Sequence, residues 1–312
     1  MSLSNNPQRS MRAAVWHGRH DIRVEDVPLP VSPPAGWVQI RVQGFSVGEP
    51  VAADACQHCG TCYYCTHGLY NICENLAFTG LMNNGAFAEL VNVPANLLYK
   101  LPANFPAEAG ALIEPLAVGM HAVKKAGSLL GQNVVVVGAG TIGLCTIICA
   151  KAAGAAQVIA LEMSGARKTK AHEVGATHVL DPNQCDALAE VRRLTGGLGA
   201  DVSFECIGNK HTAKLAIDLI RKAGKCVLVG IFEEPSEFNF FELVATEKQV
   251  LGALAYNGEF ADVIAFIADG RLDITPLVTG RIQLEQIIGQ GFEELVKNKE
   301  HNVKIIVSPA RV

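Results

Sequence analysis

The apolar and polar positions divide the chain into a β-rich first part and a second part in which short strands alternate with helices. Residues 134–137 are all valine, which predicts a strand buried on both faces. The pattern predicts further strands at residues 157–161, 178–180, 201–205, 225–229 and 250–254. It predicts helices that end near residues 154, 175, 194, 224 and 270, most of them with a glycine just beyond. Six strands with helices between them indicate an α/β fold with a parallel, doubly wound sheet.

The first part of the chain has a different pattern, in which prolines separate short apolar runs. The runs that predict short strands or a brief helix lie at residues 13–16, 38–42, 76–101 and 106–112. A longer helix is expected to begin at Glu114 and to lead into the second part. Residues 303–307 predict a closing strand that could complete the sheet of the first part. We therefore expect a separate, mostly-β lobe built from both ends of the chain.

A glycine-rich turn, Gly-Ala-Gly-Thr-Ile-Gly, directly follows the four valines. Gly138 would allow a sharp turn, Gly140 would leave room for a pyrophosphate, and Gly143 would let the next helix pack closely. The phosphates would lie at the helix N-terminus, where unpaired N–H groups and the helix dipole favour negative charge. A turn without a ligand is the alternative, but its place between a strand and a helix argues for a Rossmann-type dinucleotide site. The expected site residues are Gly138, Gly140, Thr141, Ile142 and Gly143.

The end of the second predicted strand indicates which dinucleotide is bound. Glu162 lies 19 positions after Gly143, where a carboxylate can accept hydrogen bonds from both hydroxyls of the adenosine ribose. It would also repel a 2′-phosphate. Arg167 could pair with Glu162, stack on the adenine or tolerate a phosphate. We therefore expect NAD rather than NADP, with Glu162 and Arg167 as further cofactor-binding residues.

Five cysteines are concentrated in the first part of the chain, at positions 56, 59, 62, 65 and 73. Four thiolates at such close spacing can surround a zinc ion tetrahedrally and leave no open position, which is typical of a structural site. The five cysteines compete for four places. His58 and His67 are also possible ligands, although surface histidines are the simpler interpretation beside so many thiolates.

Composition restricts the partners and the compartment. The net charge is −4 and the isoelectric point is near 6.1, which argues against nucleic acid as the main partner. The first ten residues carry no apolar signal core, and ten cysteines without such a signal indicate a reducing compartment. Glycines interrupt the longest apolar run, so no membrane span and no membrane partner are expected. These features predict a soluble, cytoplasmic protein.

The order of these features resembles that of the zinc-containing medium-chain alcohol dehydrogenases, and most closely their 2,3-butanediol and sorbitol dehydrogenase branch. The residues that carry the resemblance are Cys59, Cys62, Cys65, Cys73, the segments 68–73, 114–119, 291–295 and 303–307, the glycine turn and Glu162. The resemblance implies a Rossmann-type sheet plus a mostly-β GroES-like catalytic lobe, and a structural zinc on these four cysteines. It also implies a homo-oligomer that uses NAD to interconvert a small secondary alcohol and its ketone.

One part of the family pattern is missing. These enzymes hold a second, catalytic zinc, a Lewis acid for the substrate oxygen, mainly through a Cys-Gly-x-Cys-Gly-Ser-Asp-like stretch and a Gly-His-Glu stretch. Neither stretch is present, no cysteine precedes Cys56, and residues 44–51 resemble the family segment that follows Gly-His-Glu. We therefore expect an internal deletion between Val42 and Gly44. Glu114 matches the glutamate that this branch carries beside the catalytic metal. A catalytic zinc usually has three protein ligands, so Glu114 alone leaves the catalytic zinc doubtful. About one zinc per chain is therefore expected.

The expected organisation has four segments: a disordered N-terminus at 1–10, an incomplete GroES-like lobe at 11–116, an NAD-binding domain at 117–270 and a return to the lobe at 271–312. Three hypotheses for the function stay open. The chain is an NAD-dependent alcohol or polyol dehydrogenase, a truncated NAD-binding pseudoenzyme or isoform, or a zinc-free NADPH quinone reductase. Glu162 and the cysteine loop argue against the third.

Overall fold

The computed structural model describes residues 10–42, 49–298 and 301–309. Contacts within the chain divide it into two units. The first unit contains Met1–Ala111, Gly280–Lys299 and Ile305–Val312, and the second contains Leu112–Thr279 and Glu300–Lys304. Apart from Ser10, the N-terminus that we expected to be disordered lies outside the described residues, and so does Gly44 at the expected deletion.

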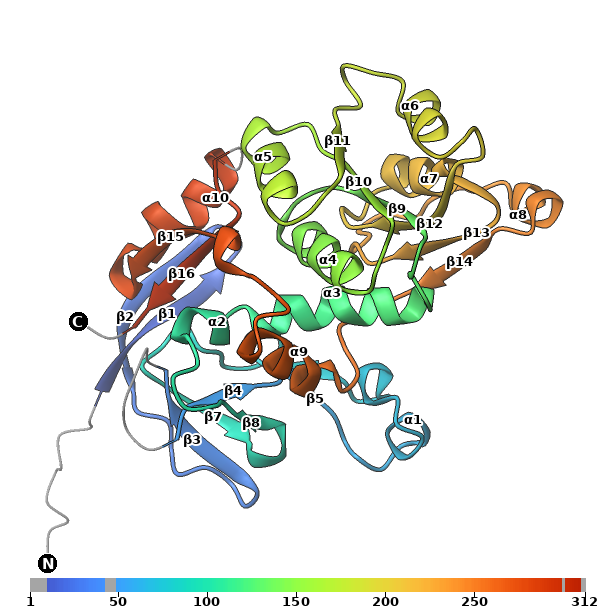
Figure 1. Ribbon diagram of the computed structural model, residues 1–312. Coiled ribbons are helices and arrows are strands. Elements are labelled where there is room, and N and C mark those ends of the chain that lie inside the picture. The colour runs from blue at the N-terminus through green and yellow to red at the C-terminus, as the bar shows by residue number, and fades with distance from the viewer. Residues whose placement is uncertain (1–9, 43–48, 299–300, 310–312) are drawn as a thin grey trace, which may run out of the picture. The chain divides into compact units, whose positions relative to one another are not determined.

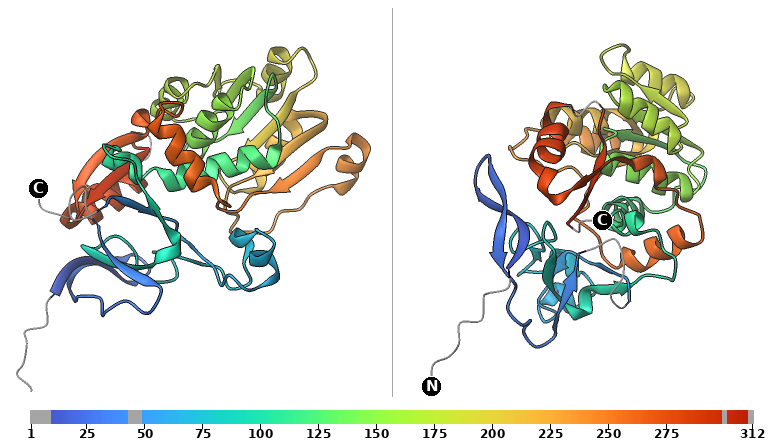
Figure 2. Two further views of the ribbon diagram at one scale, coloured as in Figure 1. Left: turned by 60° about the horizontal axis from the view of Figure 1, so that its bottom comes forward. Right: turned by 90° about the vertical axis from the view of Figure 1, so that its left-hand side faces the viewer.

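The second unit is built around a six-stranded sheet in the order β11–β10–β9–β12–β13–β14 (Figures 1 and 2). Its strands are β9 (Asn133–Val137), β10 (Gln157–Leu161), β11 (His178–Leu180), β12 (Ala200–Glu205), β13 (Ile220–Leu228) and β14 (Gln249–Gly252). All neighbouring strands are parallel. The register places Val134 of β9 beside Val158 of β10 and Val202 of β12. The predicted parallel sheet is confirmed, and β9 lies between β10 and β12.

Helices connect these strands, and apolar side chains fill both faces of the sheet. The helices of this unit are α3 (Ile113–Ala126), α4 (Thr141–Ala152), α5 (Gly165–Glu173), α6 (Ala187–Leu194), α7 (Lys210–Leu219), α8 (Phe240–Thr246), α9 (Glu259–Ala268) and the 3₁₀ turn η3 (Thr275–Leu277). Val135 of β9 belongs to the same core as Val191 of α6 and Ile217 of α7. Val134 is equally buried, and it points to the opposite face because successive side chains of a strand alternate.

Glycine allows α3 and α4 to approach closely. A Cβ added at Gly119 of α3 would lie 2.8 Å from the backbone carbonyl carbon of Cys145 in α4, so a larger residue would push the helices apart. On the same helix His121 is buried, and its Nδ1 lies 3.3 Å from Glu259 Oε1 of α9. His121 is thus packed in the interior of this unit.

Two predictions about elements of this unit were wrong. The helix expected to end near Gly224 ends at Leu219, and β13 begins at once with Ile220. Ala223 has a φ of 56°, so residues 221–224 form a turn-like irregularity inside the strand rather than a helix end. Helix α8 was not predicted, because its large side chains, such as Phe240 at 72% exposure, do not form a buried stripe.

The first unit consists of short strands in separate pairs. Its strands are β1 (Ser10–Gly18), β2 (Asp21–Pro28), β3 (Trp37–Arg41), β4 (Val51–Ala53), β5 (Cys56–Gln57), β6 (Ala77–Phe78), β7 (Leu90–Pro94) and β8 (Leu98–Lys100). Most residues of β15 (Val278–Gln283) and β16 (Lys304–Ser308) also belong to this unit. The described strands pair as β1–β2, β3–β7, β4–β8, β5–β6 and β15–β16. The closing strand expected at residues 303–307 is present as β16, and among the described strands it pairs only with β15.

Short helical segments link these strands. They are α1 (Tyr63–Thr66), α2 (Ala107–Gly110), α10 (Glu293–Lys297), the 3₁₀ turns η1 (Tyr70–Ile72), η2 (Ala95–Leu97) and η4 (Leu284–Gln286), and a π-helical turn, η5 (Ile287–Phe292). In the part of the chain that the structure describes, no helix has both the length and the apolar character that crossing a bilayer requires. None of the ten cysteines, all of them in described segments, forms a disulfide.

Candidate dinucleotide and metal sites

The glycine turn joins β9 to α4. Gly138 has a φ of 90°, and a Cβ added there would overlap the side chain of Ile207. A Cβ added at Gly143 would overlap the carbonyl oxygen of Gly138. At Gly140, the N-cap of α4, the nearest described atom to an added Cβ would be Arg167 Nη1, at 3.9 Å. The turn thus excludes side chains at its two ends and leaves space at its centre, which is the geometry that a pyrophosphate requires.

Thr141 and Ile142 form the first turn of α4. The Thr141 hydroxyl donates to the carbonyl oxygen of Val303, at 2.9 Å, so it is already occupied. Any contribution of these two residues to phosphate binding would therefore come from their backbone N–H groups, which belong to the first turn of a helix and lack intrahelical partners. The helix dipole adds positive potential at the same place.

Glu162 lies directly after β10 and is anchored beside the glycine turn. Its Oε2 accepts a hydrogen bond from Ala139 N at 2.8 Å. Its Oε1 accepts from Met163 N and Ser164 N, both at 2.9 Å. A carboxylate has about four acceptor positions, so roughly one remains for a ribose hydroxyl. The carboxylate reaches the predicted place, but its hydrogen-bonding capacity is mostly used by the backbone.

Arg167 lies in the first turn of α5, on the side of the glycine turn. Its guanidinium makes no ion pair with Glu162 within 4.0 Å among the described residues, so the structure does not show the pairing that the sequence left open. Its Nε is buried and has no hydrogen-bond partner in the described part of the chain. Its Nη1 bounds the space over Gly140.

Sequence analysis missed a buried carboxylate on the neighbouring strand. Glu205, at the end of β12, is fully buried, and its Oε1 accepts from Ile207 N and Gly208 N at 2.9 Å and from Thr212 Oγ1 at 2.7 Å. It thereby fixes the loop whose Ile207 side chain packs on Gly138. The sequence did carry a signal: Glu205 ends a predicted strand and Gly208 follows it three positions later. Glu162 likewise lies at the end of a predicted strand.

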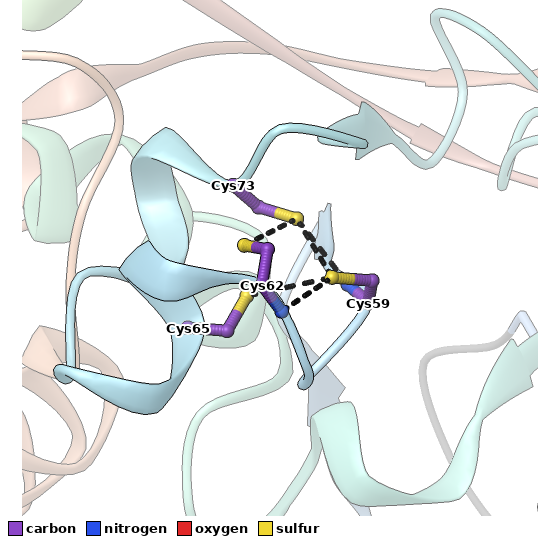
Figure 3. Close-up of side chains that lie close together, drawn as sticks. All are labelled: Cys59, Cys62, Cys65 and Cys73. Atoms are coloured by element: carbon purple, nitrogen blue, oxygen red, sulfur yellow. Dashed lines mark hydrogen bonds between the residues drawn. The ribbon is translucent and has the colours of Figure 1, made fainter.

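Four cysteine sulfurs converge in the first unit, as Figure 3 shows. The sulfur atoms of Cys59 and Cys65 are 4.0 Å apart, those of Cys62 and Cys73 3.9 Å, and those of Cys59 and Cys73 3.5 Å. Tetrahedral zinc with Zn–S bonds of about 2.3 Å would separate its sulfurs by about 3.8 Å, so the cluster fits this ion. The fifth cysteine, Cys56, is buried in β5 and is not part of the cluster.

Local structure determines the protonation of this cluster. Hydrogen bonds from the backbone of Thr61 and Cys62, with side-chain contacts, lower the pKa of Cys59 to about 5. Burial, followed by the neighbouring thiol of Cys62, raises the pKa of Cys65 to about 12. Four adjacent thiolates repel one another, and a divalent cation removes that penalty. The chemistry of the donor set therefore also suits zinc.

Glu114 lies in the first turn of α3 and is partly buried. Among the described residues, the cysteine cluster is the single group of three or more histidine, cysteine, aspartate or glutamate side chains whose ligand atoms could share a metal. Glu114 is not part of such a group. The residues present therefore do not fit the catalytic zinc of the family, and we derive no step through it.

A Rossmann-type nucleotide-binding unit joined to a mostly-β unit with a four-cysteine loop defines the class of zinc-type dehydrogenases. Comparison with known families agrees: residues 16–103 match the alcohol dehydrogenase GroES-like domain, and residues 141–269 match the zinc-binding dehydrogenase domain. The chain belongs to the zinc-containing medium-chain alcohol dehydrogenase family.

Three similar proteins illustrate the relationship. The (R,R)-butanediol dehydrogenase of Neisseria gonorrhoeae is 32% identical over 96% of this chain and 99% of its own length. The sorbitol dehydrogenase of Bacillus subtilis is 31% identical over 99% of this chain and 100% of its own. The crystal structure of 2R,3R-butanediol dehydrogenase from Bacillus subtilis has a TM-score of 0.87 and 32% identity, and the match covers 96% of this chain and 100% of that chain.

The same comparisons bear on the expected deletion. The alignment with the Neisseria protein spans 354 positions, whereas this chain has 312 residues. At least 42 aligned positions of that relative, the difference between the two numbers, thus have no counterpart here.

Proposed function

We propose that the protein is an NAD-dependent dehydrogenase that interconverts a small secondary alcohol, such as 2,3-butanediol or a sorbitol-like polyol, and its ketone. The observation that carries the proposal is the open space over Gly140 at the N-terminus of α4, with Glu162 anchored beside it. The names of the butanediol and sorbitol dehydrogenases among its relatives support the substrate class.

The residues of the second unit fit a dinucleotide in three ways. The first-turn N–H groups of α4 would receive the pyrophosphate, Gly140 would leave room for it, and Glu162 would accept a hydrogen bond from the adenosine ribose. When bound, NAD supplies the hydride acceptor of the reaction. The negative charge of Glu162 favours NAD over NADP, since a 2′-phosphate beside it would be repelled.

The metal of the first unit has a structural role in this proposal. A zinc ion on Cys59, Cys62, Cys65 and Cys73 would have no open coordination position, so it would cross-link the loop rather than contact substrate. We expect about one zinc per chain. Domain boundaries near residues 116 and 270 are part of the same proposal.

The alternative to this function is NAD binding without turnover, although the butanediol and sorbitol dehydrogenases among the relatives favour the main proposal. Among the described residues, the four cysteines are the one group of side chains that could hold a metal. A chain with this zinc alone could bind NAD without turnover. Such a protein would keep the dinucleotide site and the structural zinc of its family and lack the Lewis acid that activates the alcohol.

One experiment separates these functions. The purified protein is titrated with NAD by calorimetry and is then assayed for NADH formation at 340 nm with 2,3-butanediol and with sorbitol. The main proposal predicts binding together with turnover in the range typical of enzymes, roughly 1–10³ per second. Binding without turnover would support the second candidate, and absence of NAD binding would contradict both.

The partners and the compartment are proposals of the same kind. We propose a homo-oligomer in the cytoplasm, with no nucleic-acid or membrane partner. Phe240, Phe241 and Val244 of α8 are each more than 70% exposed, which supports self-association through this region. The free thiols of all ten cysteines, found throughout described segments, support a reducing compartment. A monomer in light-scattering measurements at micromolar concentration would contradict the oligomer.

A further inference from the structure

The cysteine cluster contains the one cysteine of the chain that is exposed to solvent. All ten cysteines lie in described segments, and Cys59 is exposed, whereas four others have intermediate exposure and five are buried. Thiolates that solvent can reach are the form of cysteine that peroxides oxidise, and buried structural thiols are inert. Cys59 is therefore the cysteine that a dissolved oxidant reaches most readily.

The sulfur of Cys73 lies close to that of Cys59. The two atoms are 3.5 Å apart, and the other two sulfur contacts that Figure 3 marks measure 3.9 and 4.0 Å. A tetrahedral zinc needs a separation of about 3.8 Å, so this pair is closer together than the metal requires. A disulfide has an S–S bond of about 2.05 Å, so the two sulfurs would have to approach by roughly 1.5 Å. Rotation of the two side chains can provide that displacement.

The backbone holds Cys59 and Cys73 together independently of a metal. Cys59 N and Asn75 N both donate hydrogen bonds to Cys73 Sγ, each at 3.3 Å. Strands β5 and β6 flank the loop that carries the cluster, and they pair with each other, with Gln57 beside Ala77. The two ends of the loop therefore stay adjacent when the metal leaves, as an intramolecular disulfide requires.

We propose that the cysteine cluster is also an oxidation site, at which a peroxide converts Cys59 and Cys73 into a disulfide and the loop loses its zinc. This inference rests on the structural zinc of the proposed function. A disulfide removes two of the four thiolates, and the two that remain, Cys62 and Cys65, are too few to close a zinc shell. The disulfide joins the same two ends of the loop that the metal holds, so oxidation exchanges one cross-link for another.

The reaction is a two-electron exchange between two thiolates and one peroxide. The Cys59 thiolate attacks an oxygen of hydrogen peroxide, an S–O bond forms as the O–O bond breaks, and the products are a sulfenic acid and hydroxide. The Cys73 thiolate then attacks the sulfenic sulfur, forms the S–S bond and expels a second hydroxide. Both hydroxides take a proton from the solvent, so the peroxide is reduced to two water molecules. A thiol reductant reverses the change by thiol–disulfide exchange.

The test treats the zinc-loaded wild-type protein with hydrogen peroxide near neutral pH. Released zinc is measured with a colorimetric chelator, free thiols with a thiol reagent, and cross-linked peptides by mass spectrometry after chymotrypsin digestion without reduction. Chymotrypsin cleaves after Tyr64 and Tyr70, so Cys59, Cys65 and Cys73 fall in three different peptides. We expect the loss of about one zinc per chain and of two of the ten free thiols, with Cys59 and Cys73 cross-linked.

A control and a reversal make the result specific. Cys185→Ser removes a partly exposed thiol outside the cluster, so it should release zinc and lose two thiols as the wild type does. A thiol reductant with added zinc should restore both the zinc and the free thiols. Zinc loss that reduction does not reverse would overturn the proposal, because it would show oxidation beyond the disulfide.

The peptide map of the wild-type protein decides the proposal without any variant of the cluster. A disulfide between another pair of cysteines would overturn it, and so would retention of the zinc with all cluster thiols intact. If the protein holds no zinc before treatment, the proposed structural zinc fails. If it holds zinc and peroxide leaves Cys59 and Cys73 without a cross-link, only this inference fails.

Discussion

Each sulfur in the cysteine cluster depends on its neighbours for its charge. Backbone donors hold the pKa of Cys59 at about 5, while burial raises that of Cys65 to about 12. Without a cation the cluster could ionise only in part, and with zinc all four sulfurs would be thiolates. The loop between residues 59 and 73 has little other regular structure than α1 and η1, so its order should depend on the metal.

Removal of one ligand should therefore remove the metal. We expect Cys73→Ser to reduce bound zinc from about one per chain to almost none, because three thiolates and a hydroxyl bind the ion much more weakly. The measurement is elemental analysis after dialysis against a weak chelator. Cys185→Ser is the control, since this thiol lies outside the cluster and should leave the zinc content unchanged. Full zinc retention in Cys73→Ser would refute the assignment.

Glu162 gives a second prediction at the scale of a residue. Glu162→Ala should weaken NAD binding by about 10- to 100-fold, because it removes an ionised acceptor and releases the N–H of Ala139 in the glycine turn. Fluorescence or calorimetric titration measures the change. Glu173→Ala, which affects an exposed pair with Lys170 on α5, should bind NAD like the wild type. Equal affinities for all three proteins would remove Glu162 from the site.

At the scale of elements, hydrophobic pattern and turn residues were sufficient for most of the second unit. Strands β10 and β11 begin and end where the pattern predicts, and helix α6 ends where it predicts, because buried strands and helix ends leave strong local signals. The boundary between α7 and β13 was not predictable, since apolar Ile220 continues the helical pattern into the strand.

The candidate site was predictable only where the spacing of residues along the sequence determines how close they lie in the structure. The glycine turn and the four cysteines are local motifs, and the structure brings each set together. The buried state of Glu205 and the Arg167 Nε that has no hydrogen-bond partner among the described residues depend on contacts between distant segments, which no local pattern encodes. Such tertiary contacts are the part of a site that sequence reasoning does not reach.

The packing of α3 on α4 gives a prediction about stability. Gly119→Val should lower the free energy of unfolding by about 1–3 kcal/mol or more, because its side chain would overlap the backbone near Cys145. Thermal or urea unfolding measures the change. Gly165→Ala is the control: an added Cβ there meets nothing within 4 Å, so its stability should be close to that of the wild type. Equal stabilities of the two variants would contradict the close helix contact.

The contact between α3 and α9 should make stability depend on pH. Burial opposes ionisation of Glu259, but His121, the backbone of Asn257 and Lys124 outweigh it and lower the pKa of Glu259 below its ordinary value of 4.5. A carboxyl whose pKa is lower in the folded state contributes its stability above pH 4.5, and that contribution is lost as the pH falls through the folded pKa.

Glu259→Gln tests this dependence. The variant should melt at a lower temperature than the wild type near neutral pH, and the difference should shrink as the pH falls below 4.5. Differential scanning calorimetry between about pH 7 and pH 3 measures both curves. Glu173→Gln, in an exposed pair, should show no comparable change. A difference that stays constant over this range would exclude the ionised Glu259 as its cause.

At the scale of the whole molecule, the described parts of the two units differ in their sheets. The second unit has a continuous six-stranded sheet with a complete glycine turn. The described strands of the first unit form only two-stranded pairs, and the chain lacks at least 42 positions of its Neisseria relative, counted as the 354 aligned positions less its 312 residues. Cofactor binding is therefore the part of the proposed function that the described residues support most directly. Turnover would depend on how the first unit binds and activates the alcohol.

The most direct test of this account is a calorimetric titration of the zinc-loaded wild-type protein with NAD. We expect saturable binding of one NAD per chain with a dissociation constant in the micromolar range, about −8 kcal/mol at 1 μM. Absence of saturable binding up to about 1 mM NAD, in a protein whose melting curve shows that it is folded, would contradict it.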